Sequence, residues 1–369
     1  RVHGELICFC NTFVHREMSP VQSIAKSNSS EVPPQYIQPI HNRPLLPQRC
    51  HENAHIYSRD ERSIIPAIDL SQPKASVIQQ IREASKHWGA FHILNHGVSL
   101  EIINDTIQAG LHFFEESQME EKLRYSCDPN YPFASQGYGS KMLASSDDSS
   151  VLDWRDYFDH HTLPLSRRDP SRWPRDPPNY RETISAYSDA ISSLASHLLS
   201  LISESLDLPP DLIGNSIGEF FQNITISYYP PCPQPDLTLG LQSHSDMGAI
   251  SLLIQDHVPG LQIYRNSEWF TVHPVPDAIL VLLSDQTEII TNGEYRSAEH
   301  RVVTNREFSR ISVAAFHDPS AERIISPAKE TVTADSTVRY REIKYGEYIS
   351  SWYTKGPEGR RNLDALISS

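Results

Sequence analysis

The chain has 369 residues, of which 38% are hydrophobic, and this suits one large globular domain or two closely packed ones. Its formal net charge of -14 comes from 46 acidic and 32 basic residues without a basic stripe, which argues against a nucleic-acid partner. The five cysteines are odd in number and scattered, which argues against a disulfide framework and favours a reducing, cytoplasmic location.

The first 60 residues are predicted to form an N-terminal arm. Residues 1–17 precede Met18 and are expected to be an extraneous or disordered extension, with a degenerate targeting peptide as the alternative. Their apolar run from Leu6 to Val14 is much shorter than the roughly 20 residues that cross a bilayer, so no membrane partner is expected. The serine-rich and proline-rich stretch that follows predicts loops with at most one short helix.

The region 61–215 is predicted to be mainly helical. His92 and His96 lie on a predicted strand without a nearby acidic partner, so they are interpreted as structural histidines, and His160 and His161 as a loop pair. Hydrophobic periodicity and turn residues predict, in chain order, a strand at 64–70, a helix from Pro73 to Gly89, a strand at 90–97, a helix at 100–114, a loop at 131–178 and a long helix at 179–206.

The region 216–320 is predicted to be a β-rich domain, because many short strands separated by turns are typical of a barrel or jelly roll. A C-terminal segment, 321–369, follows and contains a helix. The predicted fold class is therefore α+β. The expected strands lie at 224–229, 248–254, 261–264, 269–272, 278–283, 301–303 and 311–316.

A histidine and an aspartate two residues apart, His244 and Asp246, lie at the end of a predicted strand, so both side chains can face the same side. A second histidine, His300, follows 54 residues after Asp246. Two histidines and one carboxylate leave coordination positions open and suit non-haem iron(II) and oxygen chemistry. Zinc can bind a similar set, so these residues alone do not identify the metal.

Arg310 and Ser312 follow His300 and share one face of a predicted strand. A guanidinium group grips a carboxylate through two hydrogen bonds and a hydroxyl adds a third, which is what the distal carboxylate of 2-oxoglutarate requires. Alone, an Arg-x-Ser pair carries little information. The pair becomes informative because it follows the two histidines and the aspartate in this order and at this spacing.

These motifs resemble those of the plant 2-oxoglutarate- and iron-dependent dioxygenases, in the specialised-metabolism class that includes anthocyanidin synthase, flavonol synthase and the jasmonate-inactivating oxygenases. The resemblance covers nearly everything from Val21 to Ser369. The matching text includes Trp88-Gly89-Ala90-Phe91, Asn95-His96-Gly97-Val98, Gly137-Tyr138-Gly139-Ser140, Tyr228-Tyr229-Pro230-Pro231-Cys232-Pro233, His244-Ser245-Asp246, Ser297-Ala298-Glu299-His300-Arg301 and Arg310-Ile311-Ser312.

The resemblance implies a double-stranded β-helix (jelly-roll) core with flanking helices, and a dioxygenase that needs iron(II), 2-oxoglutarate and O2, with ascorbate as reductant. It implies a lid helix in the C-terminal segment. By the same resemblance, iron is bound by His244, Asp246 and His300, 2-oxoglutarate is bound by Arg310, Ser312 and Tyr229, and the organic substrate is contacted by Tyr138, Phe316 and Asp318.

Two alternatives stay open at this point: a related iron oxidase that does not use 2-oxoglutarate, and a non-catalytic small-molecule-binding protein on the same fold. Ser227 stands where the family usually has asparagine, so one co-substrate contact is expected to be lost or bridged by water. The basic residues of the jasmonate-oxidising branch are not evident, since Thr225 precedes the tyrosines. We therefore expect a monomer that oxidises a neutral or cationic substrate containing an aromatic ring.

Overall fold

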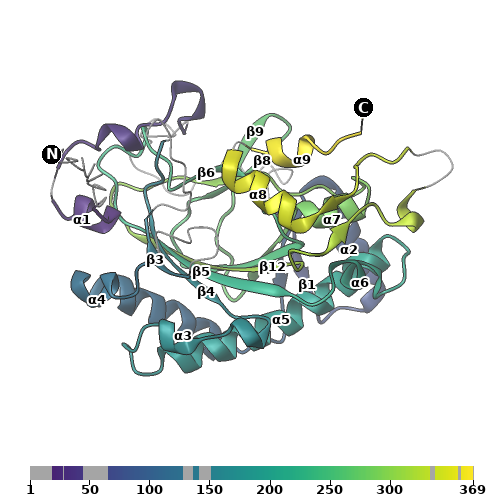
Figure 1. Cartoon of the computed structure of the whole chain (residues 1–369), viewed down its shortest axis with the longest axis horizontal. Helices are drawn as coiled ribbons and strands as arrows, with labels where there is room; N and C mark the ends of the chain where they lie inside the picture. Colours follow the sequence, from purple (N-terminus) through teal and green to yellow (C-terminus); the bar gives the residue numbers. More distant parts are fainter. Residues whose placement is uncertain are drawn as a thin grey trace, which may run out of the picture.

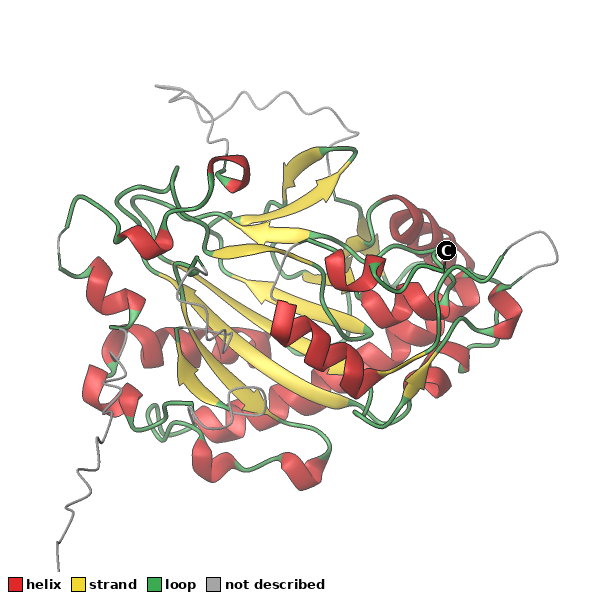
Figure 2. Ribbon diagram, turned by 45° about the horizontal axis from the view of Figure 1, so that its top comes forward, coloured by secondary structure: helices red, strands yellow, loops and turns green. Residues whose placement is uncertain are grey.

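Two β-sheets face each other, and helices cover the outer side of the larger sheet (Figure 1). The computed structural model describes residues 19–27, 29–44, 65–127, 136–140, 151–332, 337–355 and 359–368. The expectation for residues 1–17 lies outside these residues. The facing sheets form the jelly-roll core that the sequence predicted, with helices around it (Figure 2).

The larger sheet has eight strands in the order β1-β2-β10-β7-β12-β5-β4-β3, and its strands after β1 and β2 pair in antiparallel fashion. Strands from the helical first half of the chain therefore extend the same sheet as strands from the second half. The bounds are β1 (Ala67–Asp69), β2 (Ala90–Leu94), β3 (Gly137–Gly139), β4 (Asp156–His161), β5 (Phe221–Tyr229), β7 (Ile250–Gln255), β10 (Ile279–Leu283) and β12 (Arg310–Asp318).

Strand β12 separates two environments because its side chains alternate between the two faces of the sheet. Its odd-numbered residues Ile311, Val313 and Ala315 are buried in the main hydrophobic core, beside the helices. Its even-numbered residues, from Arg310 to Asp318, face the space between the two sheets. The strand thus presents Arg310, Ser312 and Asp318 inward, toward the smaller sheet.

The smaller sheet has four strands in the order β6-β11-β8-β9. At one end of the space between the sheets, apolar side chains such as Leu253 and Leu282 from the larger sheet meet Leu261, Ile263 and Val302 from the smaller one. This packing closes that end. The strands are β6 (Leu241–His244), β8 (Leu261–Arg265), β9 (Glu268–Thr271) and β11 (His300–Val302).

Helices α2 (Lys74–His87), α3 (Leu100–Leu111) and α5 (Tyr180–Ser205) pack together on the outer face of the larger sheet. The predicted apolar stripe of the longest helix is confirmed, since Ile184, Ile191 and Leu198 of α5 are fully buried. Helix α2 follows Pro73 and ends before Gly89, whose φ is +62°. A Cβ atom at Gly89 would lie 2.2 Å from the Arg296 carbonyl oxygen, so glycine is required at this turn.

One prediction about local structure was wrong, and one helix was not predicted. The segment 131–178, predicted to be loop, contributes β3 and β4 to the larger sheet, and His160 and His161 therefore lie on a strand. Residues 285–290 form a short helix, α7 (Asp285–Ile290), that the hydrophobic pattern did not indicate because the segment is shorter than two turns and its four polar residues are buried like its two isoleucines.

The remaining helices lie at the two ends of the chain and in the connections. The described residues of the arm include one short α-helix, whose first two backbone N–H groups, at Val21 and Gln22, donate to the Asp156 carboxylate. No helix among the described residues is long and apolar enough to cross a bilayer. These elements are α1 (Val21–Ala25), α4 (Met119–Leu123), α6 (Leu212–Ile217), β13 (Ile324–Ile325), β14 (Ile343–Lys344), α8 (Tyr345–Lys355) and α9 (Arg361–Asp364), with short 3-10 or π turns at Pro34–Tyr36, Ile40–Asn42, His112–Glu116, Leu165–Arg167, Pro170–Arg172 and Lys329–Thr331.

Candidate active site

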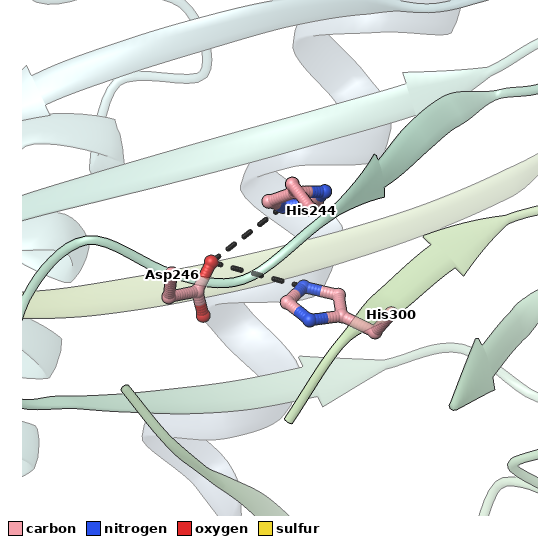
Figure 3. A group of neighbouring side chains, drawn as sticks. All are labelled: His244, Asp246 and His300. Atoms are coloured by element: carbon pink, nitrogen blue, oxygen red, sulfur yellow. Dashed lines mark ion pairs between the residues drawn. The ribbon is translucent and has the colours of Figure 1, made fainter. Parts of the chain in front are cut away.

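The predicted metal-binding residues meet where β6 and β11 pair. Strand β6 ends at His244, Asp246 follows two residues later, and β11 begins at His300, directly opposite His244. His244 Nε2 and His300 Nε2 lie 3.6 Å and 3.7 Å from Asp246 Oδ1 (Figure 3). Within the described part of the chain, this is the one group of three His, Cys, Asp or Glu side chains close enough to hold a metal ion.

Backbone hydrogen bonds fix the orientation of both imidazole rings. His244 Nδ1 lies 2.8 Å from the Gln242 carbonyl oxygen, and His300 Nδ1 lies 2.9 Å from the Ala298 carbonyl oxygen. Because a carbonyl can only accept, each Nδ1 carries a proton, and in the neutral ring the Nε2 lone pair is left for a metal. This arrangement prepares neutral histidines for metal binding.

The three groups also adjust each other's protonation. Burial disfavours the ionised form of Asp246, but the facing His300 and His244 rings outweigh it and lower the carboxyl pKa to about 2. Burial and the neighbouring His244 lower the pKa of His300 to about 4, whereas Asp246 raises the pKa of His244 despite its burial. One carboxylate and at least one neutral imidazole are therefore available at neutral pH.

These residues fit a divalent transition metal. Asp246 Oδ2 is buried and accepts no hydrogen bond from any described residue, which leaves it free to bind a cation. Two imidazole nitrogens and one carboxylate oxygen are the donor set that non-haem iron(II) uses when it keeps positions open for other ligands.

Arg310, Ser312 and Tyr229 lie together on the inner face of the larger sheet. The register places Arg310 opposite Tyr229, and the guanidinium carbon lies 5.1 Å from the centre of the tyrosine ring. The buried guanidinium donates to Gln255 Oε1 at 2.7 Å and to Ser312 Oγ at 3.4 Å. Gly260 packs so closely that a Cβ atom there would lie 2.9 Å from Arg310 Cδ. The structure thus holds a cation and two hydroxyl groups beside the histidines and Asp246.

All six of these residues line one cavity of about 360 Å³ between the sheets, a size suited to small molecules. Two of the three residues expected to contact substrate, Phe316 and Asp318, also line it. Burial raises the pKa of the Asp318 carboxyl to about 7. Its Oδ1 atom has no hydrogen-bond partner among the described residues and fits only because Gly248, where a Cβ atom would lie 2.0 Å away, has no side chain.

The third expected substrate residue, Tyr138, lies elsewhere. Its hydroxyl donates to Asp156 Oδ2 at 3.1 Å, and its ring packs against Phe113 and Phe114 in the main core. Tyr138 is not among the residues that line the cavity. We therefore leave it out of the substrate site proposed below.

Strand β4 and the segments on either side of it bring further charged or titratable side chains into the cavity, among them Arg155, Asp159, His161 and Arg167, and none of these four had been expected at the site. Arg155, Asp159 and His161 are separated by even numbers of residues, so recognising β4 as a strand would have placed their side chains on one face. Thr225 on β5 donates to Asp159, and Arg155 donates to Ser227 Oγ at 3.1 Å. The cavity is therefore not devoid of basic residues, contrary to the expectation from the sequence.

His160, next to His161, points to the other face of β4 and is fully buried. Its Nδ1 donates to the Ile224 carbonyl at 2.8 Å and its Nε2 accepts from the Tyr180 hydroxyl at 3.0 Å. Burial lowers its pKa to about 3. It is a structural histidine on a strand rather than the loop residue that was predicted.

Known proteins resemble this chain over most of its length. The model of the 2OG-Fe(II) oxygenase superfamily matches residues 220–319, and the model described as non-haem dioxygenase in morphine synthesis N-terminal matches residues 65–180. Jasmonate-induced oxygenase 4 of Arabidopsis thaliana is 37% identical over 353 residues, covering 94% of this chain and 96% of that protein. Protein DOWNY MILDEW RESISTANCE 6 of the same plant is 37% identical over 345 residues, covering 92% and 96%.

Among solved structures, the crystal structure of JOX2 in complex with 2OG, Fe and JA superimposes with a TM-score of 0.85 at 33% identity, covering 95% of this chain and 98% of that one. Fold, catalytic cavity and relatives agree, which sets aside the non-catalytic binding protein and the oxidase without 2-oxoglutarate. The chain belongs to the 2-oxoglutarate- and iron(II)-dependent oxygenase superfamily and is a dioxygenase that acts on a small molecule.

Proposed function

We propose that this dioxygenase oxidises a plant specialised metabolite by hydroxylation, demethylation or desaturation, while 2-oxoglutarate is converted to succinate and CO2. In this proposal His244, Asp246 and His300 bind the iron, and Arg310, Ser312 and Tyr229 bind 2-oxoglutarate. The observation that carries the assignment is that both sets line one cavity, with the carboxylate-binding arginine on the strand register opposite Tyr229.

Bound iron(II) would supply the activation of oxygen that couples the decarboxylation of 2-oxoglutarate to oxidation of the substrate. The protein's share is positioning. Arg310 and Ser312 would hold the distal carboxylate, so that the other end of 2-oxoglutarate reaches the histidines. The hydrogen bonds of His244 and His300 to backbone carbonyls would keep both Nε2 atoms directed at the metal.

For the organic substrate, we extend the proposal to a neutral or cationic molecule with an aromatic ring. Phe316 and Trp352 supply aromatic surface in the cavity wall. The positive charge of Arg155 already has acidic neighbours, because Tyr229, Asp153, Tyr157 and Asp159 together raise its pKa against burial, and two of these four are carboxyl groups. A substrate carboxylate placed there would meet these two acidic groups as well, which disfavours an acidic substrate.

The same comparison gives the proposal a demanding test, because JOX2 was crystallised with JA. Arg155 and Arg167 are the two cavity residues of this chain that could pair with a substrate carboxylate, apart from the Arg310 reserved for 2-oxoglutarate. Jasmonate therefore belongs in any substrate panel. Tighter binding and faster turnover of jasmonate than of neutral or amine-containing aromatic compounds would overturn the proposed substrate class.

The remaining parts of the proposal concern the partners, the cellular location and the oligomeric state of the enzyme. The net charge of -14 supports a small-molecule enzyme without a nucleic-acid or membrane partner. We place it in the cytoplasm as a monomer, in keeping with its odd and scattered cysteines. Gel filtration with light scattering tests the monomer directly, and a fluorescent fusion tests the compartment.

The first experiment is to measure succinate release by the purified protein with Fe(II), 2-oxoglutarate, ascorbate and O2. Flavonoids, coumarins, alkaloids and jasmonate form the panel, and His244→Ala is the matched control. We expect iron-dependent succinate that increases with one class of compound and disappears in His244→Ala. Equal succinate from both proteins would refute the proposed iron ligand.

A further inference from the structure

The C-terminal helix α8 forms one wall of the active-site cavity. Its cavity-lining residues recur at helical spacing, so one face of the helix points at the site. Figure 1 shows α8 above the open side of the larger sheet, opposite α5. The ring centre of Trp352 lies 6.5 Å from that of His244. The lining residues are Tyr345, Ile349, Trp352 and Tyr353.

Tyr348, which flanks this face of α8, links the helix to the backbone of a proposed iron ligand. The Tyr348 hydroxyl donates to Asp285 Oδ2 at 2.5 Å, and both side chains are buried. The backbone N–H of Asp285 in turn donates to the Asp246 carbonyl oxygen at 2.9 Å. A short chain of two hydrogen bonds therefore links the helix to Asp246.

Beyond α8, the chain returns and pairs with β6, the strand that carries His244. Gly359 donates its N–H to the Ser243 carbonyl at 3.0 Å and accepts from the Ser245 N–H at 3.2 Å. These two bonds form a parallel bridge centred on His244. The C-terminal segment thus adds to the edge of the smaller sheet at the metal site.

The residue after this bridge, Arg360, enters a buried polar network. Its guanidinium donates to Glu288 Oε1 and to the Ser297 carbonyl oxygen, each at 2.6 Å. Glu288 has no exposed surface and also accepts from the Tyr340 hydroxyl at 2.5 Å and from the Ser297 N–H at 2.5 Å. Ser297 lies three residues before His300, so the network joins α7, the approach to β11 and the C-terminal segment.

We propose that Glu288 and Arg360 are positioning residues that hold the C-terminal segment closed, so that Trp352 and Tyr353 complete the substrate-facing wall of the iron cavity. The inference rests on the proposed function for the meaning of that wall. It does not depend on which substrate the enzyme takes.

The buried pair fits a positioning role better than a role in overall stability. Removing two charges from water costs free energy that their attraction roughly offsets, so a buried ion pair adds little net stability. It does require one geometry, because the two guanidinium N–H groups and the two Glu288 oxygens must each meet the partners described above. Only with the C-terminal segment in place does Glu288 keep the hydrogen bonds from Arg360 described above.

The test uses the full-length iron-loaded enzyme and three variants. Arg360→Met removes the charge, and Arg360→Lys keeps the charge but not the forked pair of hydrogen bonds. Lys344→Met is the matched control, because it breaks an ion pair of the same segment, with Glu322, that is exposed. The first two readouts are succinate release with and without the best compound of the panel, and the KM for 2-oxoglutarate. The third is the rate at which trypsin cleaves after lysine and arginine residues of the C-terminal segment.

For Arg360→Met we expect trypsin cleavage of the C-terminal segment to accelerate by roughly tenfold or more, since an orphaned buried carboxylate favours local opening. Stimulation of succinate release by the compound should fall by a similar factor, while the KM for 2-oxoglutarate changes less than about twofold. Arg360→Lys should recover much of the loss, and Lys344→Met should behave as wild type.

Wild-type cleavage and wild-type stimulation in Arg360→Met would overturn the inference. An equal rise in the KM for 2-oxoglutarate would also overturn it, because that result indicates general loosening of the site. If Arg360→Met does not fold, the double variant Glu288→Met with Arg360→Met removes both charges and takes its place, with the same expected loss of stimulation. Absence of succinate from the wild type refutes the proposed function instead, and the cleavage assay still decides the role of the pair.

Discussion

Replacing Arg310 tests the proposed co-substrate site most sharply. The guanidinium is 3% exposed and has hydrogen bonds to Gln255 and Ser312, with its face toward Tyr229. In Arg310→Met the distal carboxylate of 2-oxoglutarate would be buried without a cation. Truncating one partner of a buried, hydrogen-bonded charge pair typically costs about 2 to 5 kcal/mol. The KM for 2-oxoglutarate should therefore rise by a factor of about 30 to several thousand.

For Arg310→Lys we expect a KM for 2-oxoglutarate between those of the wild type and Arg310→Met. Lysine keeps the charge but cannot offer the forked pair of donors, so we expect a loss of about 1 to 2 kcal/mol, or roughly tenfold in KM. The assay is the initial rate of succinate release against 2-oxoglutarate concentration, at saturating iron. Arg167→Met is the matched control, because Arg167 lines the same cavity away from Ser312 and Tyr229. An unchanged KM in Arg310→Met, or an equal rise in Arg167→Met, would refute the assignment.

Three further outcomes are expected. Gly260→Ala should raise the KM for 2-oxoglutarate several-fold without changing metal affinity, since its Cβ would press on Arg310 Cδ at 2.9 Å, and an unchanged KM would show that the arginine can move aside. Asp318→Asn should weaken cationic panel compounds by roughly tenfold and leave neutral ones unaffected in KM measurements, whereas equal effects on both would argue against charge recognition. Burial lowers the pKa of His160 to about 3, so between pH 6.5 and pH 3 only the unfolded chain binds a proton at this residue. The free energy of unfolding should therefore decrease as the pH falls, by roughly 2 to 3 kcal/mol from His160 at pH 4.5. Urea unfolding at several pH values should show a weaker pH dependence of this free energy in His160→Gln.

The core of the site was predictable because it follows the regular geometry of paired strands. The period of two along a strand placed Arg310 and Ser312 on one face, and β12 confirms that alternation. His244 and His300 meet because β11 pairs with β6, a long-range contact that spacing alone cannot fix. The resemblance to a known family supplied that contact.

Strand β4 was missed for a physical reason. An ordinary strand of an antiparallel sheet has polar residues toward water and apolar residues toward the core. In β4, Phe158 and His160 face the buried helical side, while Asp159 and His161 face the catalytic cavity. The polar side of β4 therefore faces the cavity and not the solvent. Because its charged and aromatic residues lie in a proline-rich stretch, their composition resembled that of a loop.

The sequence predicts the iron and 2-oxoglutarate residues more readily than the residues that would contact the substrate. The proposed iron and 2-oxoglutarate residues lie on strands whose register fixes their neighbours, so a short motif carries their geometry. The wall that we propose to face the substrate combines residues of β4, β12 and α8, and in our proposal its shape depends on where Glu288 and Arg360 hold the C-terminal segment. No local period relates Asp159 to Trp352. Relatives that share every iron-binding motif can therefore differ in substrate through side chains, and through a helix position, that no motif records.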